Sequence, residues 1–247
     1  MALPRIDSPV YDLTLPVSKT NLRFRPFLVK EQRNLMMAME ANDSETIEKN
    51  IKQVLTNCTL TESVNIEELP IIDVEYYFLQ LRARSVGEVV KTRYRCENLV
   101  DDKPCGNPME TEMNLLEIKV DDNGVKDEIN ITDTIIVKLR YPQFSIINNA
   151  KEDKTATDLA FDMIVNSIEY IYDGNQFYYA KETSREELTE FIESLNQDQF
   201  SRIEEYFDNL PKLNKKIQMT CSKCGFNHNI EVEGLENFFG QFFVMTI

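Results

Sequence analysis

The sequence predicts an α+β protein in which a helical N-terminal region follows a β-hairpin, and a split Cys₄ zinc ribbon carries a large inserted α/β segment. Apolar residues at helical spacing dominate the first part of the chain, and the alternation typical of strands begins at Glu88. Four of the five cysteines lie in two similar turns that are far apart in the sequence. The expected regions are an N-terminal hairpin and helical region (1–87), a split ribbon (88–118 and 212–247) and an insertion (119–211).

The composition is that of a globular protein. Its 247 residues, 42% hydrophobic and 28% charged, are enough for one large domain or two small ones. The first residues lack the apolar segment of a signal peptide, and no stretch reaches the ~18–20 apolar residues of a membrane helix. We therefore expect a cytoplasmic protein without membrane contact, in which clustered cysteines bind metal or catalyse rather than form disulfides.

The N-terminal region is expected to hold a hairpin and three helices. The alternating segments YDLTLP and LRFRPF flank the polar SKTN within residues 9–28, as in a hairpin. Helices are expected over 29–43 and 44–58, and a third over 69–87. The stripe that this third helix is expected to bury consists of Ile72, Tyr76, Leu79 and Ala83.

Strands and helices alternate in the rest of the chain. Strands are expected in EVVKTRYRC (88–96), METEMNLLEIKV (109–120) and DTIIVKLRYP (133–142). A helix over 155–171 precedes a hairpin that turns at Asp173-Gly174. A capping box of Ser184 and Glu187 begins the next helix. One more helix, DQFSRIEEYFDNLP, and two strands around the last two cysteines complete the pattern.

The two cysteine turns follow one plan. YRCENLVDDKPCGNPME and MTCSKCGFNHNIE each run through a strand, a cysteine, a turn, Cys-Gly and a new strand. The glycine permits a positive-φ turn that directs backbone N–H groups at the thiolates. Four thiolates complete the tetrahedral shell of one structural Zn²⁺. The predicted zinc ligands are Cys96, Cys105, Cys221 and Cys224.

Other interpretations of these residues remain open. The cysteines can be metal-free thiols, or Cys221 and Cys224 can form a redox pair if Cys221 is exposed and its pKa is low. A redox pair normally begins a helix, whereas a β-like segment follows here. His228, four residues after Cys224, is an alternative ligand. Cys58 is expected to be a small core residue.

The sequence does not resemble that of an enzyme. Its single histidine lies beside a cysteine turn, so a Ser/His/Asp or Cys/His relay has no free base, and no phosphate-binding loop or dinucleotide motif is present. Acidic pairs such as DVE (73–75) are typical of solvated helix faces. A complete Cys₄ shell leaves zinc no open position for catalysis. We therefore expect no small-molecule substrate.

The segment LENFFGQFFVMTI at the end of the chain combines apolar and aromatic residues. If it is a helix, its apolar side chains fall on one face, which must pack on something, either the protein's own ribbon or a partner. Aromatic residues are enriched where interfaces concentrate their binding energy. The expected partner-binding residues are Leu235, Phe238, Phe239 and Phe242.

Two N-terminal stretches carry a family resemblance. LTLPVSKTNLRFRPFLVKEQRNLMMAME and LPIIDVEYYFLQLRARSVGEVVKTRYRC resemble the baseplate-hub proteins of T4-like contractile-tailed bacteriophages, a group that includes hub subunits and hub-assembly factors. The resemblance covers about residues 9–100, and CSKCG is consistent with it. It implies a structural or assembly role in the tail baseplate hub, with other hub proteins as partners. It places the protein in the host cytoplasm during assembly, with the virion tail baseplate as a further location.

The alternative function is a viral zinc-ribbon adaptor that acts on nucleic acid or the transcription machinery. The net charge of −15 disfavours nucleic acid, because phosphate binding normally requires a basic surface. This alternative requires one basic face composed of Lys91, Arg93, Arg95, Lys215 and Lys216.

Overall fold

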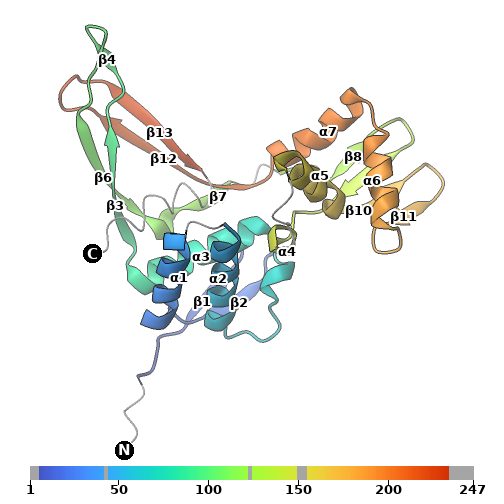
Figure 1. Cartoon of the computed structure of the whole chain (residues 1–247), viewed down its shortest axis with the longest axis horizontal. Helices are drawn as coiled ribbons and strands as arrows, with labels where there is room; N and C mark the ends of the chain where they lie inside the picture. Colours follow the sequence, from blue (N-terminus) through green and yellow to red (C-terminus); the bar gives the residue numbers. More distant parts are fainter. Residues whose placement is uncertain (1–5, 42–43, 122–123, 149–154, 234–247) are drawn as a thin grey trace, which may run out of the picture. The chain divides into compact units, whose positions relative to one another are not determined.

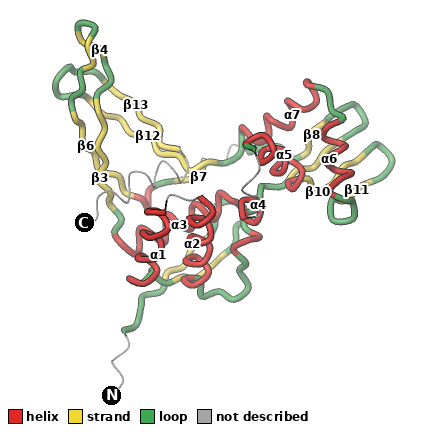
Figure 2. Tube along the Cα trace, in the orientation of Figure 1, coloured by secondary structure: helices red, strands yellow, loops and turns green. Residues whose placement is uncertain are grey.

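The computed structural model describes residues 6–41, 44–121, 124–148 and 155–233. Helices and sheets are both present, which confirms the α+β class (Figures 1 and 2). The chain forms two compact units. The first comprises Met1–Asn65, Ile72–Asp121 and Lys212–Ile247, and the second comprises Ile66–Ile71 and Asp122–Pro211.

The first unit combines the N-terminal helices with the two cysteine hairpins. In chain order, its elements are Tyr11–Thr14 (β1), Asn21–Phe24 (β2), Val29–Ala41 (α1), Ser44–Cys58 (α2), Ile71–Val86 (α3), Val89–Arg95 (β3), Leu99–Val100 (β4), Lys103–Pro104 (β5), Pro108–Asn114 (β6), Leu115–Glu117 (η2), Lys119–Asp121 (β7), Lys212–Thr220 (β12) and Asn227–Glu233 (β13). The antiparallel β1–β2 pair confirms the first hairpin. Helices α1, α2 and α3 occur where the sequence predicts them.

The strand expected over 109–120 is divided into two. Strand β6 ends at Asn114, whose side chain accepts a hydrogen bond from the Leu116 backbone N–H and caps the 3₁₀ turn η2. Leu115 in this turn is completely buried. Beyond the turn, β7 pairs with β12 instead of continuing alongside β3. The buried turn thus redirects the chain, which alternation alone does not reveal.

Helix α3 is the centre of the first unit. Ile72, Leu79 and Ala83 are buried, and Tyr76 packs against the same core, as the sequence predicts. The helix is also buried on a second side. There Tyr77 stacks edge-on against Phe24 of β2, with ring centroids 5.4 Å apart. The helix therefore joins the N-terminal hairpin to the core beneath the cysteine hairpins.

A buried carboxylate ties the first hairpin to α3. Asp73 is fully buried and accepts hydrogen bonds from the backbone N–H groups of Val17 and Ser18, at 2.9 and 2.8 Å. These donors satisfy an anion that would otherwise be costly to bury. The expectation that acids of the DVE segment lie on a solvated helix face is therefore wrong for Asp73. Its role in the structure is to hold the turn between β1 and β2.

The second unit is an antiparallel sheet with helices. Its elements are Ile66–Glu68 (η1), Glu128–Asn130 (β8), Ile136–Leu139 (β9), Phe144–Asn148 (α4), Ala156–Ser167 (α5), Ile168–Tyr172 (β10), Phe177–Tyr179 (β11), Arg185–Glu193 (α6) and Gln197–Asp208 (α7). The strand order is β11-β10-β9-β8. Its core joins Val137 and Ile171 of the sheet to Ile164, Leu188 and Ile203 of α5, α6 and α7.

Local signals locate most elements of this unit correctly. The capping box of Ser184 and Glu187 is present, and the hairpin turns at Asp173-Gly174. Helix α5 ends earlier than expected, at Ser167, because Ile168 begins β10. The short elements β8 and α4 were not predicted, since three to five residues are too few to display a period.

Candidate metal centre

The cysteine turn that follows β3 contains the small hairpin β4–β5. The Cys105 backbone N–H donates to the Asn98 carbonyl at 2.8 Å, and the Gly106 N–H donates to the Cys96 carbonyl at 2.9 Å. Gly106 has a φ of +63°, which glycine adopts without the steric cost of a Cβ. These bonds bring Cys96 and Cys105 together although eight residues separate them.

The turn between β12 and β13 repeats this arrangement in shorter form. The Gly225 N–H donates to the Cys221 carbonyl at 2.9 Å, and the Cys221 N–H donates to the Phe226 carbonyl at 2.9 Å. Gly225 also has a positive φ, +73°. The equivalent bond in the first turn joins the Cys96 N–H to the Asn107 carbonyl. The shared Cys-Gly pattern in the sequence therefore corresponds to a shared backbone geometry.

The two turns place four sulfurs around one point. The Sγ atoms of the cluster lie within 4.8 Å of one another, and its members are Cys96, Cys105, Cys221 and Cys224. Sγ–Sγ distances are 3.6 Å for Cys96–Cys224 and 3.8 Å for Cys105–Cys221. A tetrahedral site with Zn–S bonds of about 2.3 Å has sulfurs about 3.8 Å apart. The spacing therefore fits a tetrahedral metal ion and is too long for disulfides.

Polar side chains surround the sulfurs. His228 Nε2 lies 3.2 Å from Cys96 Sγ, so His228 contacts a sulfur and is not part of the four-residue cluster. The Nδ2 atoms of Asn98 and Asn107 lie 3.7 Å from Cys224 Sγ and 3.6 Å from Cys221 Sγ. Such outer donors orient thiolate ligands and offset their charge. Sequence reasoning missed both asparagines, although each lies within two residues of a cysteine.

The pKa values of two thiols in this cluster are shifted in opposite directions. Burial raises the pKa of Cys96 to about 12. Backbone N–H groups of Cys224 and Lys223 lower the pKa of Cys221 to about 6, although burial opposes them. A redox cysteine also needs access to its substrate, but Cys221 is only 1% exposed and a strand follows the turn instead of a helix. The redox interpretation therefore meets one of its two requirements.

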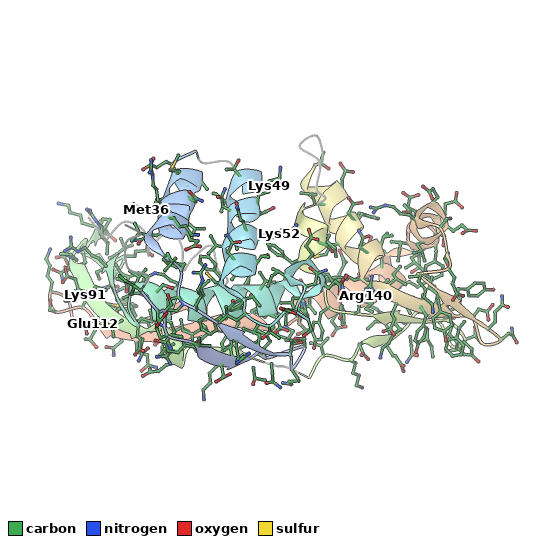
Figure 3. The ribbon with its side chains drawn as sticks, turned by 90° about the horizontal axis from the view of Figure 1, so that it is seen from below. Met36, Lys49, Lys52, Lys91, Glu112 and Arg140 are labelled. Atoms are coloured by element: carbon green, nitrogen blue, oxygen red, sulfur yellow. The ribbon has the colours of Figure 1, made fainter. Side chains whose placement is uncertain are left out.

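Four of the five basic residues that the nucleic-acid alternative requires lie beside carboxylates. Lys91 faces Glu112 across β3 and β6 at 3.5 Å (Figure 3), and Arg93 pairs with Glu110. The two lysines of β12 also have carboxylate partners; the pairs are Lys215–Glu117 and Lys216–Glu231, each at 3.5 Å. Adjacent residues of a strand point to opposite sides, so these two lysines cannot share a face. The nucleic-acid alternative is not supported.

Leu235, Phe238, Phe239 and Phe242 lie outside the described residues. None of the helices in the described ranges combines the length and apolar character needed to cross a bilayer.

Comparisons with known proteins gave one result. The model of a family described as "T4 bacteriophage base plate protein" matches residues 8–240. Searches of curated proteins and of solved structures found no significant match.

Proposed function

Because the chain belongs to the T4 bacteriophage base plate protein family, whose model matches nearly its whole length, we propose that it is a structural or assembly component of the central baseplate hub. The family establishes a structural role in the phage baseplate. The match is the observation that carries the baseplate assignment. The resemblance of residues 9–100 to hub subunits and hub-assembly factors supports the narrower hub assignment. The protein then acts by binding other hub proteins, in the host cytoplasm during assembly and in the virion tail.

We further propose that the cysteine cluster binds one structural Zn²⁺ per chain. Four sulfurs near tetrahedral spacing, backbone N–H donors and three neighbouring polar side chains support this proposal. Four protein ligands leave no position for a substrate, so the metal stabilises the fold and does not catalyse a reaction. The residues that would hold the ion are Cys96, Cys105, Cys221 and Cys224.

The zinc proposal is tested by elemental analysis of protein purified without chelator. We expect one zinc per chain, and loss of the metal with a lower melting temperature in Cys221→Ser. Cys58→Ala is the matched control, because Cys58 is a buried free cysteine outside the cluster. It should keep its zinc even if its core packing is weakened. Wild-type protein without stoichiometric metal would refute the proposal.

The hub assignment is tested in infected cells. Purification of the hub complex, followed by mass spectrometry, should recover this chain together with other hub proteins. We propose that Leu235, Phe238, Phe239 and Phe242 contribute to docking. A deletion of residues 235–247 should then keep its zinc and thermal stability but fail to co-purify with hub components. If the truncated protein instead loses zinc and stability, the segment belongs to the core; if it still assembles into working hubs, neither role holds.

A further inference from the structure

The charge of the protein is concentrated in the second unit. By sequence, Ile66–Ile71 and Asp122–Pro211 contain 21 Asp and Glu residues against 8 Lys and Arg, a net charge of −13. The net charge of the whole chain is −15, so the first unit is close to neutral. A unit with such an excess of acids attracts basic partners and repels acidic ones over distances of about 8–10 Å at physiological salt.

Strands β10 and β11 of this unit present four neighbouring aromatic rings. The antiparallel register places Tyr170 opposite Tyr179 and Tyr172 opposite Phe177. Ring centroids are 5.1 Å apart for Tyr170–Phe177, 4.6 Å for Tyr172–Phe177 and 6.0 Å for Phe177–Tyr179. We call these four residues the ring cluster.

The ring cluster lies on the side of the sheet opposite the core. Ile171, between Tyr170 and Tyr172, is buried with residues of the three helices. Successive side chains of a strand point to opposite faces, so the two tyrosines point away from this core. Phe177 and Tyr179 remain 51% and 41% exposed. Neighbouring exposed aromatics are typical of interaction surfaces, because few solvated faces of a monomer gather them.

The neighbours of the ring cluster on the side of β9 and β8 favour cations. In the same cross-strand row, Tyr170 lies beside Lys138, which lies beside Glu128 of β8. The Tyr170 hydroxyl donates to Glu128 at 2.9 Å, and the Lys138 ammonium is paired with Asp127 at 2.7 Å. Lys138 is thus shared between Asp127 and Glu128, and these three groups together keep one negative charge. Both the ring faces and these carboxylates attract a positive group.

One cation of the protein already uses this surface. The Lys181 ammonium lies 5.4 Å from the centroid of the Tyr179 ring and 3.5 Å from Glu182. It shows the kind of contact that the ring faces accept, a cation over an aromatic ring with a carboxylate nearby. Phe177 has no such cation in the described part of the chain. The exposed half of its side chain can meet a cation from a partner.

We propose that the ring cluster docks a basic segment of another baseplate protein, one that inserts Arg or Lys side chains between apolar ones. The charge of the second unit favours a basic partner. A second copy of this chain or a nucleic acid would bring more negative charge to a unit whose net charge is already −13. The inference rests on the proposed role in protein binding, but it involves residues other than 235–247. It also requires no metal.

The test uses the full-length protein and a fluorescein-labelled synthetic peptide of alternating Arg and Val, followed by fluorescence anisotropy. A peptide of alternating Glu and Val is the charge control. The double variant Phe177→Ser/Tyr179→Ser removes the two most exposed rings, and Phe226→Ser, an exposed aromatic of the first unit, is the matched control. Melting temperature and zinc content verify that each variant is folded.

We expect the Arg-Val peptide to bind the wild type and the Phe226→Ser variant equally, and the double variant about tenfold more weakly, since each exposed cation–π contact contributes ~0.5–1 kcal/mol. The Glu-Val peptide should not bind. Equal binding by the double variant would overturn the proposal. So would direct binding of labelled single-stranded DNA to the wild type that the double variant abolishes, or a dimer in sedimentation that the double variant abolishes. If the peptide does not bind as expected, the co-purification test of the hub assignment is unaffected. Likewise, if deletion of residues 235–247 abolishes co-purification, peptide binding should be unchanged.

Discussion

Leu79 offers the most direct measure of how the first unit is held together. It is 2% exposed on α3 and belongs to one core cluster with residues of β3, β6, β12 and β13. Leu79→Ala removes three carbon atoms, worth about 2.4 kcal/mol at ~0.8 kcal/mol per buried methylene. The cavity that remains adds to this cost, because elements on several sides must move to fill it. We expect a loss of about 3–4 kcal/mol in the free energy of unfolding.

The loss can be followed by urea unfolding with circular dichroism and by hydrogen exchange of α3. With a urea slope of about 3 kcal/mol/M, the midpoint should fall by about 1 M. Met37→Ala on α1 is the matched control, since Met37 is 56% exposed and its truncation should cost less than about 0.5 kcal/mol. Leu79→Asp should be insoluble, because it buries an unpaired charge. A loss below about 1 kcal/mol for Leu79→Ala, or soluble and folded Leu79→Asp protein, would refute the assigned packing of α3.

Two further predictions concern buried carboxylates of the first unit. Asp73→Ala should lower the free energy of unfolding by about 2–4 kcal/mol, because the backbone N–H groups of Val17 and Ser18 lose a charged acceptor; chemical denaturation measures this, and an unchanged midpoint would contradict it. Burial raises the pKa of Glu31, but hydrogen bonds from Arg25 and the Leu28 N–H outweigh it, so the pKa lies below its usual value. The stability from Glu31 is therefore complete above its unfolded pKa, near 4.5, and is lost as the pH falls through the lower folded value. The difference in melting temperature between wild type and Glu31→Gln should shrink in that acidic range, and a constant difference would argue against it.

The sequence alone was sufficient for several features whose chemistry is complete within neighbouring residues. The capping box of Ser184 and Glu187 and the turn at Asp173-Gly174 were predictable because their chemistry is complete within a few residues. The cysteine turns belong to the same class. Each carries its own Cys-Gly backbone signature, so the proximity of four cysteines separated by a long insertion could be inferred from two local patterns.

Only the tertiary structure decided which distant segments meet. Periodicity showed one buried side of α3 but not the second, because Tyr77 is buried by Phe24 of a hairpin far upstream. Alternation over 109–120 could not reveal that the chain turns at η2 and that β7 pairs with β12, since pairing depends on the partner strand. The contact between His228 and the Cys96 sulfur and the ring cluster of β10 and β11 likewise depend on distant parts of the chain. A local sequence pattern determines which face of a helix or strand a side chain occupies. The residue that packs against that face comes from a distant part of the chain, so the pattern does not identify it.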